Sequence, residues 1–334
     1  MNTLLEVKDL IVSFQENETE NKNKNKNEDK NEDKNETVTA VSCLSFSIRE
    51  KETLALVGET GCGKSVVAHA IMRLLPPESR VKGAIEFRGK NLLEMSEKEM
   101  AKFRGKEISI IFQNPSLALN PVYSIGHQLA EPFRIHGQEK KKEKGNTTLS
   151  KVSGALKRVG FSNPHEYLGY YPSWCSGGMN QRFLIAASTM LDPALLIADE
   201  PSKGLDRDRV SELENELKNL KEKNENALLL ISHDLGFVRR LADRVAVMYA
   251  GEIIEIAGPS SLFESPRHPY TRGLLNSLPE NGFVPIPGSS PPLSNPPAGC
   301  RFHPRCRIKE KRCMQEHPEL KESNGSAVRC FLCP

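Results

Sequence analysis

A glycine-rich run of eight residues limits what this chain can fold into more than any other feature. Residues 58–65 read G-E-T-G-C-G-K-S and fit the pattern G-x-x-x-x-G-K-[ST]. An apolar run, L-A-L-V at 54–57, precedes it, and residues 64–75 carry apolar side chains at helical spacing until Pro76 and Pro77. A strand, a phosphate-binding turn and a helix are therefore predicted in this order, as in the P-loop of α/β nucleotide-binding proteins.

The residue types of this loop suit the binding of phosphate. Glycine lets the backbone turn tightly, so that successive amide hydrogens converge on phosphate oxygens beside a helix N-terminus. We expect Lys64 to reach the β- and γ-phosphates of a nucleotide, and Ser65 to bind Mg²⁺. The predicted phosphate loop consists of Gly58, Glu59, Thr60, Gly61, Cys62, Gly63, Lys64 and Ser65.

Short apolar runs alternate with helical segments along the rest of the chain. The runs lie at 54–57, 108–112, 195–198, 228–232 and 245–249. Uninterrupted apolar strands of this length are typical of a buried, mostly parallel sheet. Between two of them, Val210, Leu213, Leu217 and Leu220 form one helical stripe. The fold class is therefore α/β.

Two carboxylates, Asp199 and Glu200, directly follow the apolar run at 195–198. In open α/β sheets, ligands bind at the carboxyl ends of the strands. We expect Asp199 to help bind Mg²⁺ and Glu200 to act as general base toward an attacking water. Taken alone, such a pair is more often a helix cap, but the phosphate loop in the same chain favours the catalytic interpretation.

Two polar segments interrupt this pattern. Residues 15–37 contain no apolar side chain, and we expect a disordered insertion there, between strands at 4–14 and 37–48. Residues 138–148 are predicted to form a charged surface loop.

Charge and hydropathy exclude several classes of protein. The 46 Lys and Arg residues against 43 Asp and Glu give a net charge of +3, which offers no argument for a nucleic-acid partner. No apolar run is long enough to cross a bilayer. Glu6 and Asp9 interrupt the only apolar stretch near the N-terminus, so no export signal is expected and we place the chain in the cytosol.

Cysteines gather at the end of the chain. Five of the eight lie within the last 35 residues, beyond a Pro-rich stretch at 285–297 that is predicted to be an extended linker. In a reducing compartment such cysteines more commonly bind metal or stay reduced than form disulfides. Four thiolates can bind an iron–sulfur cluster or Zn²⁺, and the basic residues between them are expected to offset thiolate charge; these are Arg301, His303, Arg305 and Arg307.

Other motifs resemble those of a known family. Ser176, Gly177 and Gly178, followed by M-N-Q-R at 179–182, resemble the signature segment of ATP-binding cassette (ABC) ATPases. Gln113, Glu200, Asp206 and His233 follow that family's order. F-Q-N-P-S-L-A-L-N-P at 112–121, H-P-Y-T-R-G-L-L at 268–275 and C-R-F-H-P-R-C at 300–306 resemble the ATPase subunits of oligopeptide, dipeptide and nickel importers. The resemblance covers about residues 4–334.

The resemblance implies a domain organisation. Residues 1–282 are expected to form an ABC nucleotide-binding domain with a RecA-like core, an antiparallel β subdomain and an α-helical subdomain at about 114–184. Residues 283–334 are expected to form the Pro-rich linker and a small Cys-rich C-terminal extension.

It also implies roles for single residues. Gln113 is expected to sense Mg²⁺ and the γ-phosphate, His233 to contact the γ-phosphate, and Phe14 to stack on adenine. Two subunits, related or identical, are expected to pair head to tail, with Ser176, Gly177 and Gly178 of one closing over the triphosphate of the other. Asp206 is expected to help arrange this dimer.

The implied cofactors are ATP and Mg²⁺, with a [4Fe-4S] cluster or Zn²⁺ on Cys300, Cys306, Cys313 and Cys330. The implied function is an ATPase subunit that powers peptide import from the cytoplasmic face of the membrane. Its partners are two permease subunits, a second ATPase subunit and, indirectly, an extracytoplasmic solute-binding protein. Alternatives are the same role in nickel import, a non-hydrolysing regulatory subunit, or a soluble ABC ATPase.

Three positions depart from the family pattern. Cys175 stands before the signature serine where leucine is usual, and Asn180 replaces a common arginine. Lys51 occupies a turn position where glycine is common, which predicts a strained turn.

Overall fold

The computed structural model describes residues 2–15, 37–137, 146–205, 207–224, 226–323 and 325–333. Nearly all of the predicted insertion at 15–37, and most of the polar loop at 138–148, lie outside these residues. Contacts divide the chain into two units. Unit 1 comprises Met1–Glu6, Ser47–Val57 and Glu86–Val245, and unit 2 comprises Val7–Phe46, Gly58–Ile85 and Ala246–Pro334.

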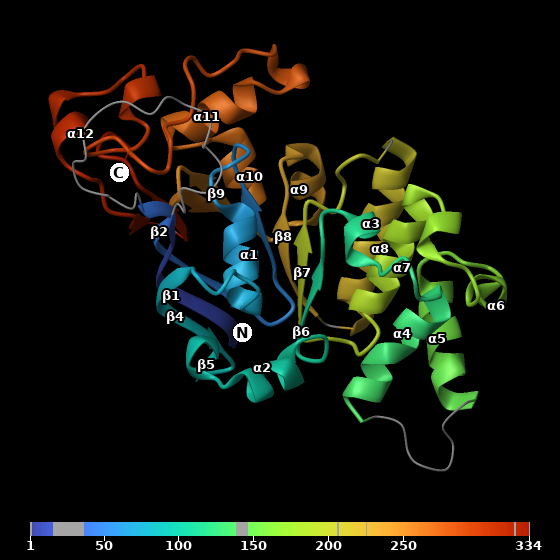
Figure 1. Ribbon diagram of the computed structural model, residues 1–334. Helices are drawn as coiled ribbons and strands as arrows, with labels where there is room; N and C mark the ends of the chain where they lie inside the picture. The colour runs from blue at the N-terminus through green and yellow to red at the C-terminus, as the bar shows by residue number, and fades with distance from the viewer. Residues whose placement is uncertain are drawn as a thin grey trace, which may run out of the picture. The chain divides into compact units, whose positions relative to one another are not determined.

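A parallel sheet forms the core of unit 1 (Figure 1). Its strands lie in the order β3 (Thr53–Val57), β8 (Ala227–Ile231), β7 (Leu195–Asp199) and β6 (Ile108–Ile111). Every residue of these strands is buried. The predicted apolar, parallel strands are confirmed, because a sheet covered on both faces leaves no position where a polar side chain reaches water.

Along the chain, the helices of unit 1 lie between the strands of this sheet or after the last of them, β8. They are α2 (Glu97–Phe103), α3 (Pro115–Ala118), α4 (Ile125–Ile135), α5 (Asn146–Arg158), α6 (Pro164–Tyr167), α7 (Gly177–Ser188), α8 (Arg207–Asn224) and α9 (Leu235–Leu241), with a short strand β5 (Lys90–Asn91) and turns η1 (Leu92–Glu94) and η2 (Pro172–Trp174). Three leucines of the predicted stripe, Leu213, Leu217 and Leu220, are buried on α8. Helices α3 to α7, at 115–188, overlap the helical subdomain expected at about 114–184, whose boundaries stay a prediction.

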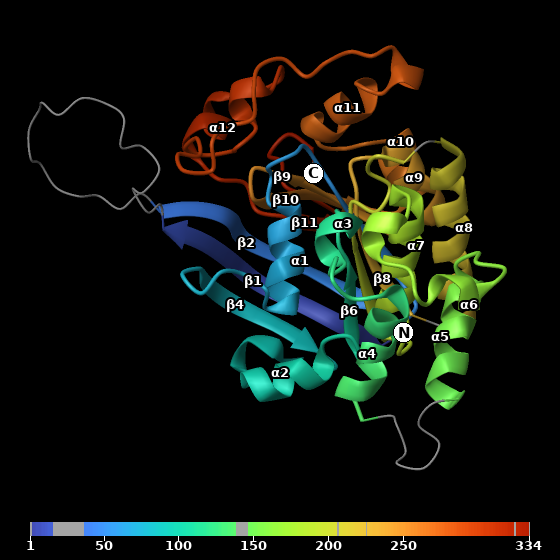
Figure 2. The same cartoon turned by 45° about the vertical axis from the view of Figure 1, so that its right-hand side comes forward.

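Unit 2 contains two groups of strands. β2 (Thr37–Arg49), β1 (Thr3–Gln15) and β4 (Arg80–Phe87) lie side by side in this order, and the ends of all three extend into unit 1 (Figure 2). The second group is β9 (Arg244–Tyr249), β10 (Glu252–Ala257), β12 (Ser326–Val328) and β11 (Lys321–Ser323). β12 pairs antiparallel with both β10 and β11, so the C-terminal segment adds strands to β10.

The helices of unit 2 are short. They are α1 (Lys64–Met72), α10 (Pro259–Glu264), α11 (Pro269–Asn276) and α12 (Lys311–Gln315), with turns η3 (Pro279–Asn281) and η4 (His303–Arg305). α1 ends before the predicted residue 75, because Arg73 adopts a left-handed conformation and Leu75 precedes a proline. Residues 283–302 contain no helix or strand, which agrees with a Pro-rich linker, and the boundary at residue 282 stays a prediction.

None of the helices in the part of the chain that the structure describes combines the length and apolar composition of a membrane span.

Candidate active site

The phosphate loop requires its glycines. Gly58, Gly61 and Gly63 have φ angles of 154°, 82° and 105°. A Cβ atom at Gly58 would overlap the carbonyl oxygen of Met248, and one at Gly63 would overlap that of Ala40. Both backbone conformation and space therefore exclude other residue types at these two positions.

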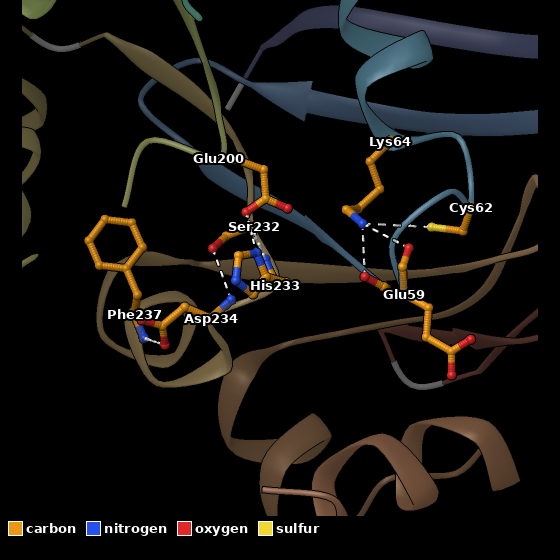
Figure 3. Close-up of polar contacts among 9 residues, drawn as sticks. Glu59, Cys62, Lys64, Glu200, Ser232, His233, Asp234 and Phe237 are labelled. Atoms are coloured by element: carbon orange, nitrogen blue, oxygen red, sulfur yellow. Dashed lines mark hydrogen bonds and ion pairs between the residues drawn. The ribbon is translucent and has the colours of Figure 1, made fainter. Parts of the chain in front are cut away.

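Lys64 lies at the start of α1 with its ammonium inside the loop (Figure 3). Its Nζ donates to the carbonyl oxygens of Gly58, at 2.8 Å, and Glu59, at 3.0 Å. The Cys62 thiol lies 3.9 Å from the same ammonium; burial raises the pKa of this thiol, and Lys64 acts in the opposite direction. The only charge that the loop directs inward is therefore the positive charge of Lys64.

The beginning of α1 suits an anion. Gly63 caps the helix, and its first turn contains no acidic side chain, so the helix dipole is uncompensated by a carboxylate there. Ser65 follows Lys64 on this first turn and is partly buried, whereas Thr60 and Gly61 are exposed.

Three predicted residues of unit 1 lie at one edge of the parallel sheet. The register pairs Ile111 with Ala198 and Asp199 with Ile231. Gln113, Glu200 and His233 each follow one of these strands by one or two residues, at the carboxyl ends of β6, β7 and β8. The predicted order of strand ends thus places all three at the edge where α/β sheets bind ligands.

Glu200 and His233 contact each other directly (Figure 3). His233 Nδ1 lies 2.5 Å from Glu200 Oε2, and the His233 backbone N–H donates to the same oxygen at 3.3 Å. The side chain of Glu200 is 9% exposed and that of His233 is 56% exposed. A buried carboxylate is thus held by an imidazole that itself faces solvent.

The backbone around Glu200 is unusual. Its φ is 50°, a left-handed conformation that is costly for a residue with a side chain, and its N–H donates to the Ile231 carbonyl at 2.8 Å. Asp199, one residue earlier, is buried at the end of β7. Because of this left-handed conformation, the backbone changes direction at Glu200, whereas Asp199 still belongs to β7.

The signature segment forms the N-terminus of α7. Ser176 is the N-cap residue, and its hydroxyl accepts a hydrogen bond from the Met179 N–H at 3.3 Å. Ser176 and Gly177 are exposed, whereas Gly178 is buried. A Cβ atom at Gly178 would overlap the guanidinium of Arg209 on α8. No local sequence pattern predicts this contact.

Two of the residues that depart from the family pattern, Asn180 and Cys175, make local hydrogen bonds. The Asn180 side-chain amide is buried and donates to the Pro172 carbonyl at 3.0 Å. The Cys175 thiol donates to the Tyr171 carbonyl at 3.4 Å, and burial raises its pKa. Lys51 has a φ of 63°, so the predicted strain in its turn is confirmed.

The predicted roles of Phe14 and Asp206 stay predictions. Phe14 is half-buried near the end of β1, and its proposed contact with adenine stays a prediction. Asp206 lies outside the described residues.

Four C-terminal cysteines lie near one another, and all eight cysteines of the chain are free thiols. The Cys300 N–H donates to the Cys313 carbonyl at 2.9 Å. Burial, together with the neighbouring thiols, raises the pKa of Cys300 and of Cys330 to about 11. Among the described residues, no group of three or more His, Cys, Asp or Glu side chains could hold a metal ion.

Arg301 and Arg305, two of the arginines between these cysteines, pair with carboxylates. Arg301 Nε lies 2.9 Å from Glu252, and Arg305 Nη1 lies 2.9 Å from Glu59 of the phosphate loop. Their predicted role in offsetting thiolate charge is therefore wrong, because carboxylates distant in sequence take both guanidinium groups.

Known families match most of the chain. Residues 41–203 match the family model described as ABC transporter, and residues 254–313 match the one described as oligopeptide/dipeptide transporter, C-terminal region. The dipeptide transport ATP-binding protein DppD of Bacillus subtilis is 43% identical over 304 residues, covering 89% of this chain and 90% of DppD. The chain belongs to the ABC transporter ATP-binding proteins. The oligopeptide transport ATP-binding protein OppD of the same organism is 40% identical, covering 98% of this chain and 88% of OppD.

Solved ABC cassettes share the fold. A dimeric cassette in a post-hydrolysis state, bound to ADP and Pi, has a TM-score of 0.64 at 20% identity, covering 77% of this chain and 99% of that one. The chain is thus an ATP-binding ABC ATPase, and the predicted family and α/β fold are confirmed.

Proposed function

We propose that this ATPase powers an importer for oligopeptides or dipeptides. The observation that carries the proposal is a phosphate loop with its lysine turned inward, in a chain about 40% identical to proteins named for dipeptide and oligopeptide transport. The C-terminal match at 254–313 belongs to the same kind of transporter.

The phosphate loop would bind the nucleotide. Lys64 exchanges its two carbonyl partners for the β- and γ-phosphates, which are stronger acceptors because they are charged. The N–H groups of Glu59 and Cys62 donate to the Tyr270 hydroxyl and to the Glu59 carbonyl, so the other residues of the loop would present their backbone N–H groups to the same anion. Phe14 would pack on the adenine.

Oxygen-bearing side chains at the strand ends and on α1 suit Mg²⁺, which prefers hard oxygen ligands. Ser65, Gln113 and Asp199 would hold it, because each offers a side-chain oxygen and Asp199 adds a negative charge. When bound, the ion supplies charge stabilisation at the phosphates.

Glu200 would accept a proton from the attacking water. Its carboxylate is buried, is fixed by two contacts with His233, and follows the strand end where substrates of α/β enzymes bind. His233, more than half exposed, would use its other ring nitrogen to contact the γ-phosphate.

A second ATPase subunit, a copy or a related chain, would complete the site. The exposed N-terminus of α7 leaves Ser176 and Gly177 accessible, and the helix dipole there favours a phosphate. Asp206 would help align the two subunits head to tail.

Two permease subunits would receive the chain at the cytoplasmic face of the membrane, with a solute-binding protein delivering cargo outside. Residues 116–133 offer the docking surface, with Leu117 84% exposed and Val122 71% exposed. Crosslinking from these positions is expected to reach a permease subunit; crosslinks to no membrane protein would contradict this assignment.

ATP-driven uptake by the assembled transporter tests the function. Glu200→Gln is expected to lower steady-state hydrolysis by at least about 100-fold and to abolish peptide uptake, while Lys64→Ala abolishes ATP binding. Glu78→Gln, at an exposed glutamate, is the control and keeps full activity. Uptake of nickel rather than peptides would contradict the proposed substrate, and unchanged hydrolysis in Glu200→Gln would contradict the role of Glu200.

An iron–sulfur cluster on Cys300, Cys306, Cys313 and Cys330 is a further, separate part of the proposal. The proximity of the thiols supports it, whereas the absence of a three-ligand group among the described residues speaks against Zn²⁺. In a cluster each iron takes one thiolate, so the four sulfurs need not converge on one ion. Anaerobic purification should give a brown protein with iron and sulfide, and Cys313→Ser should lose both; a colourless, iron-free protein would contradict the cluster.

A further inference from the structure

Glu59 places a negative charge in the phosphate loop of unit 2, where an anion is to bind. Three parts of this residue have partners: its carbonyl accepts from Lys64 at 3.0 Å, its N–H donates to the Tyr270 hydroxyl at 3.0 Å, and its carboxylate accepts from Arg305 Nη1 at 2.9 and 3.1 Å. Figure 3 shows the carboxylate pointing away from the Lys64 ammonium. The residue is therefore fixed from both backbone and side chain.

Arg305 is itself immobilised. Its side chain is 7% exposed, its Nε donates to the Pro287 carbonyl at 3.0 Å, and its guanidinium lies 5.8 Å from the centre of the Tyr249 ring. A planar guanidinium held in this way presents a fixed donor to the carboxylate, which a flexible lysine would not.

Tyr270 is equally fixed. Its ring is fully buried and packs on Tyr249, with centroids 4.6 Å apart, and on Phe302, at 5.5 Å. Its N–H donates to Nδ1 of His268 at 3.0 Å. The hydroxyl that receives the Glu59 N–H therefore has a defined position before any nucleotide binds.

We propose that Arg305 and Tyr270 are positioning residues for ATP binding: Arg305 holds the Glu59 carboxylate outside the phosphate loop and neutralises it, and Tyr270 fixes the Glu59 backbone. Without Arg305, the carboxylate is free to turn toward the triphosphate and repels it, because like charges at close range disfavour binding. The C-terminal segment thereby contributes to nucleotide affinity. This inference rests on the proposed role of the phosphate loop.

ATPase kinetics of the complete transporter test it. Arg305→Met is expected to raise KM for ATP about tenfold with kcat within about twofold, the pattern of a lost binding contribution. Tyr270→Phe, which removes one hydroxyl, changes KM in the same direction. Arg312→Met is the matched control, because Arg312 pairs with Glu316 on the surface of the same segment and leaves KM unchanged.

Rescue separates positioning from simple stabilisation of the fold. Adding Glu59→Gln to Arg305→Met removes the released charge and should return KM to within about threefold of wild type, and raised salt should shrink the defect of the single variant. An unchanged KM in Arg305→Met, or a double variant as impaired as the single one, would overturn the proposal. If Lys64→Ala also retained full ATP affinity, the proposed nucleotide site itself would fail; loss of affinity in Lys64→Ala with an unchanged Arg305→Met confines the failure to this inference.

Discussion

Nδ1 of His233 lies 2.5 Å from Oε2 of Glu200, and the backbone N–H of His233 reaches the same oxygen at 3.3 Å. His233 thus contacts a single oxygen of the carboxylate twice, through its backbone N–H and through its ring. Because both contacts come from His233, the two residues form one functional group, in which the imidazole orients the Glu200 carboxylate.

Such a unit predicts non-additive effects. His233→Ala is expected to lower kcat about ten- to 100-fold, and in the Glu200→Gln background to lower it no further, because the carboxylate that it orients is already gone. The measurement is steady-state ATP hydrolysis by the four variants of the double-mutant cycle. His165→Ala, at an exposed histidine on α6, serves as control. Effects that multiply fully would show that the two residues act independently.

The N-terminus of α7 gives a second prediction. Ser176→Asp retains an N-cap acceptor, so the free energy of unfolding should change by less than about 0.5 kcal/mol. Its negative charge would repel the γ-phosphate of the neighbouring subunit, and we expect ATP-dependent dimerisation and hydrolysis to be lost.

Ser176→Asn is the matched variant, because asparagine also caps a helix but carries no charge. It should dimerise with ATP, as gel filtration of a hydrolysis-deficient Glu200→Gln form can show. Equal dimerisation of the Asp and Asn variants would contradict a phosphate contact at this position.

Much of this site could be predicted from the sequence because it depends on local patterns. Gly58 and Gly63 are required by backbone angle and space, and an apolar run followed by a polar residue marks the carboxyl end of a buried strand. Parallel register then brings Glu200 and His233 to one edge without further information.

Contacts between distant segments could not be predicted in this way. Arg305 and Glu59 are 246 residues apart, and nothing in the local sequence of either distinguishes an ion pair from a solvated charge. The three-residue strands β11 and β12 are too short to show alternation, so the pairing of β12 with β10 and of β11 with β12 could not be predicted.

Lys51 supplies a prediction about stability. Its φ of 63° costs a residue with a side chain about 1–2 kcal/mol, whereas glycine loses about 0.5–1 kcal/mol more backbone entropy on folding. Lys51→Gly is therefore expected to raise the free energy of unfolding by about 0.5–1 kcal/mol, measured by urea denaturation. Lys51→Ala removes the side chain but keeps the strain and should give no gain; an equal gain in both variants would assign the effect to the lysine side chain.

Glu216 on α8 predicts a dependence of stability on pH. Burial raises the pKa of its carboxyl group from 4.5 to about 7, Arg182 on α7 acts in the opposite direction, and Glu212 adds to the rise. The folded chain thus holds this proton more tightly than the unfolded chain does. Stabilisation from the protonated group is complete below pH 4.5 and is lost as pH rises toward about 7, by at most about 1.4 kcal/mol per pH unit.

Glu216→Gln removes this titration, so the variant should match wild type at pH 4 and exceed it in free energy of unfolding at pH 8. Urea denaturation across this range measures the difference directly, and other titrating groups cancel between the two proteins. Glu78→Gln, at an exposed glutamate, should follow wild type at every pH. Parallel curves for wild type and Glu216→Gln would mean that the folded protein leaves the pKa of Glu216 near that of the unfolded chain.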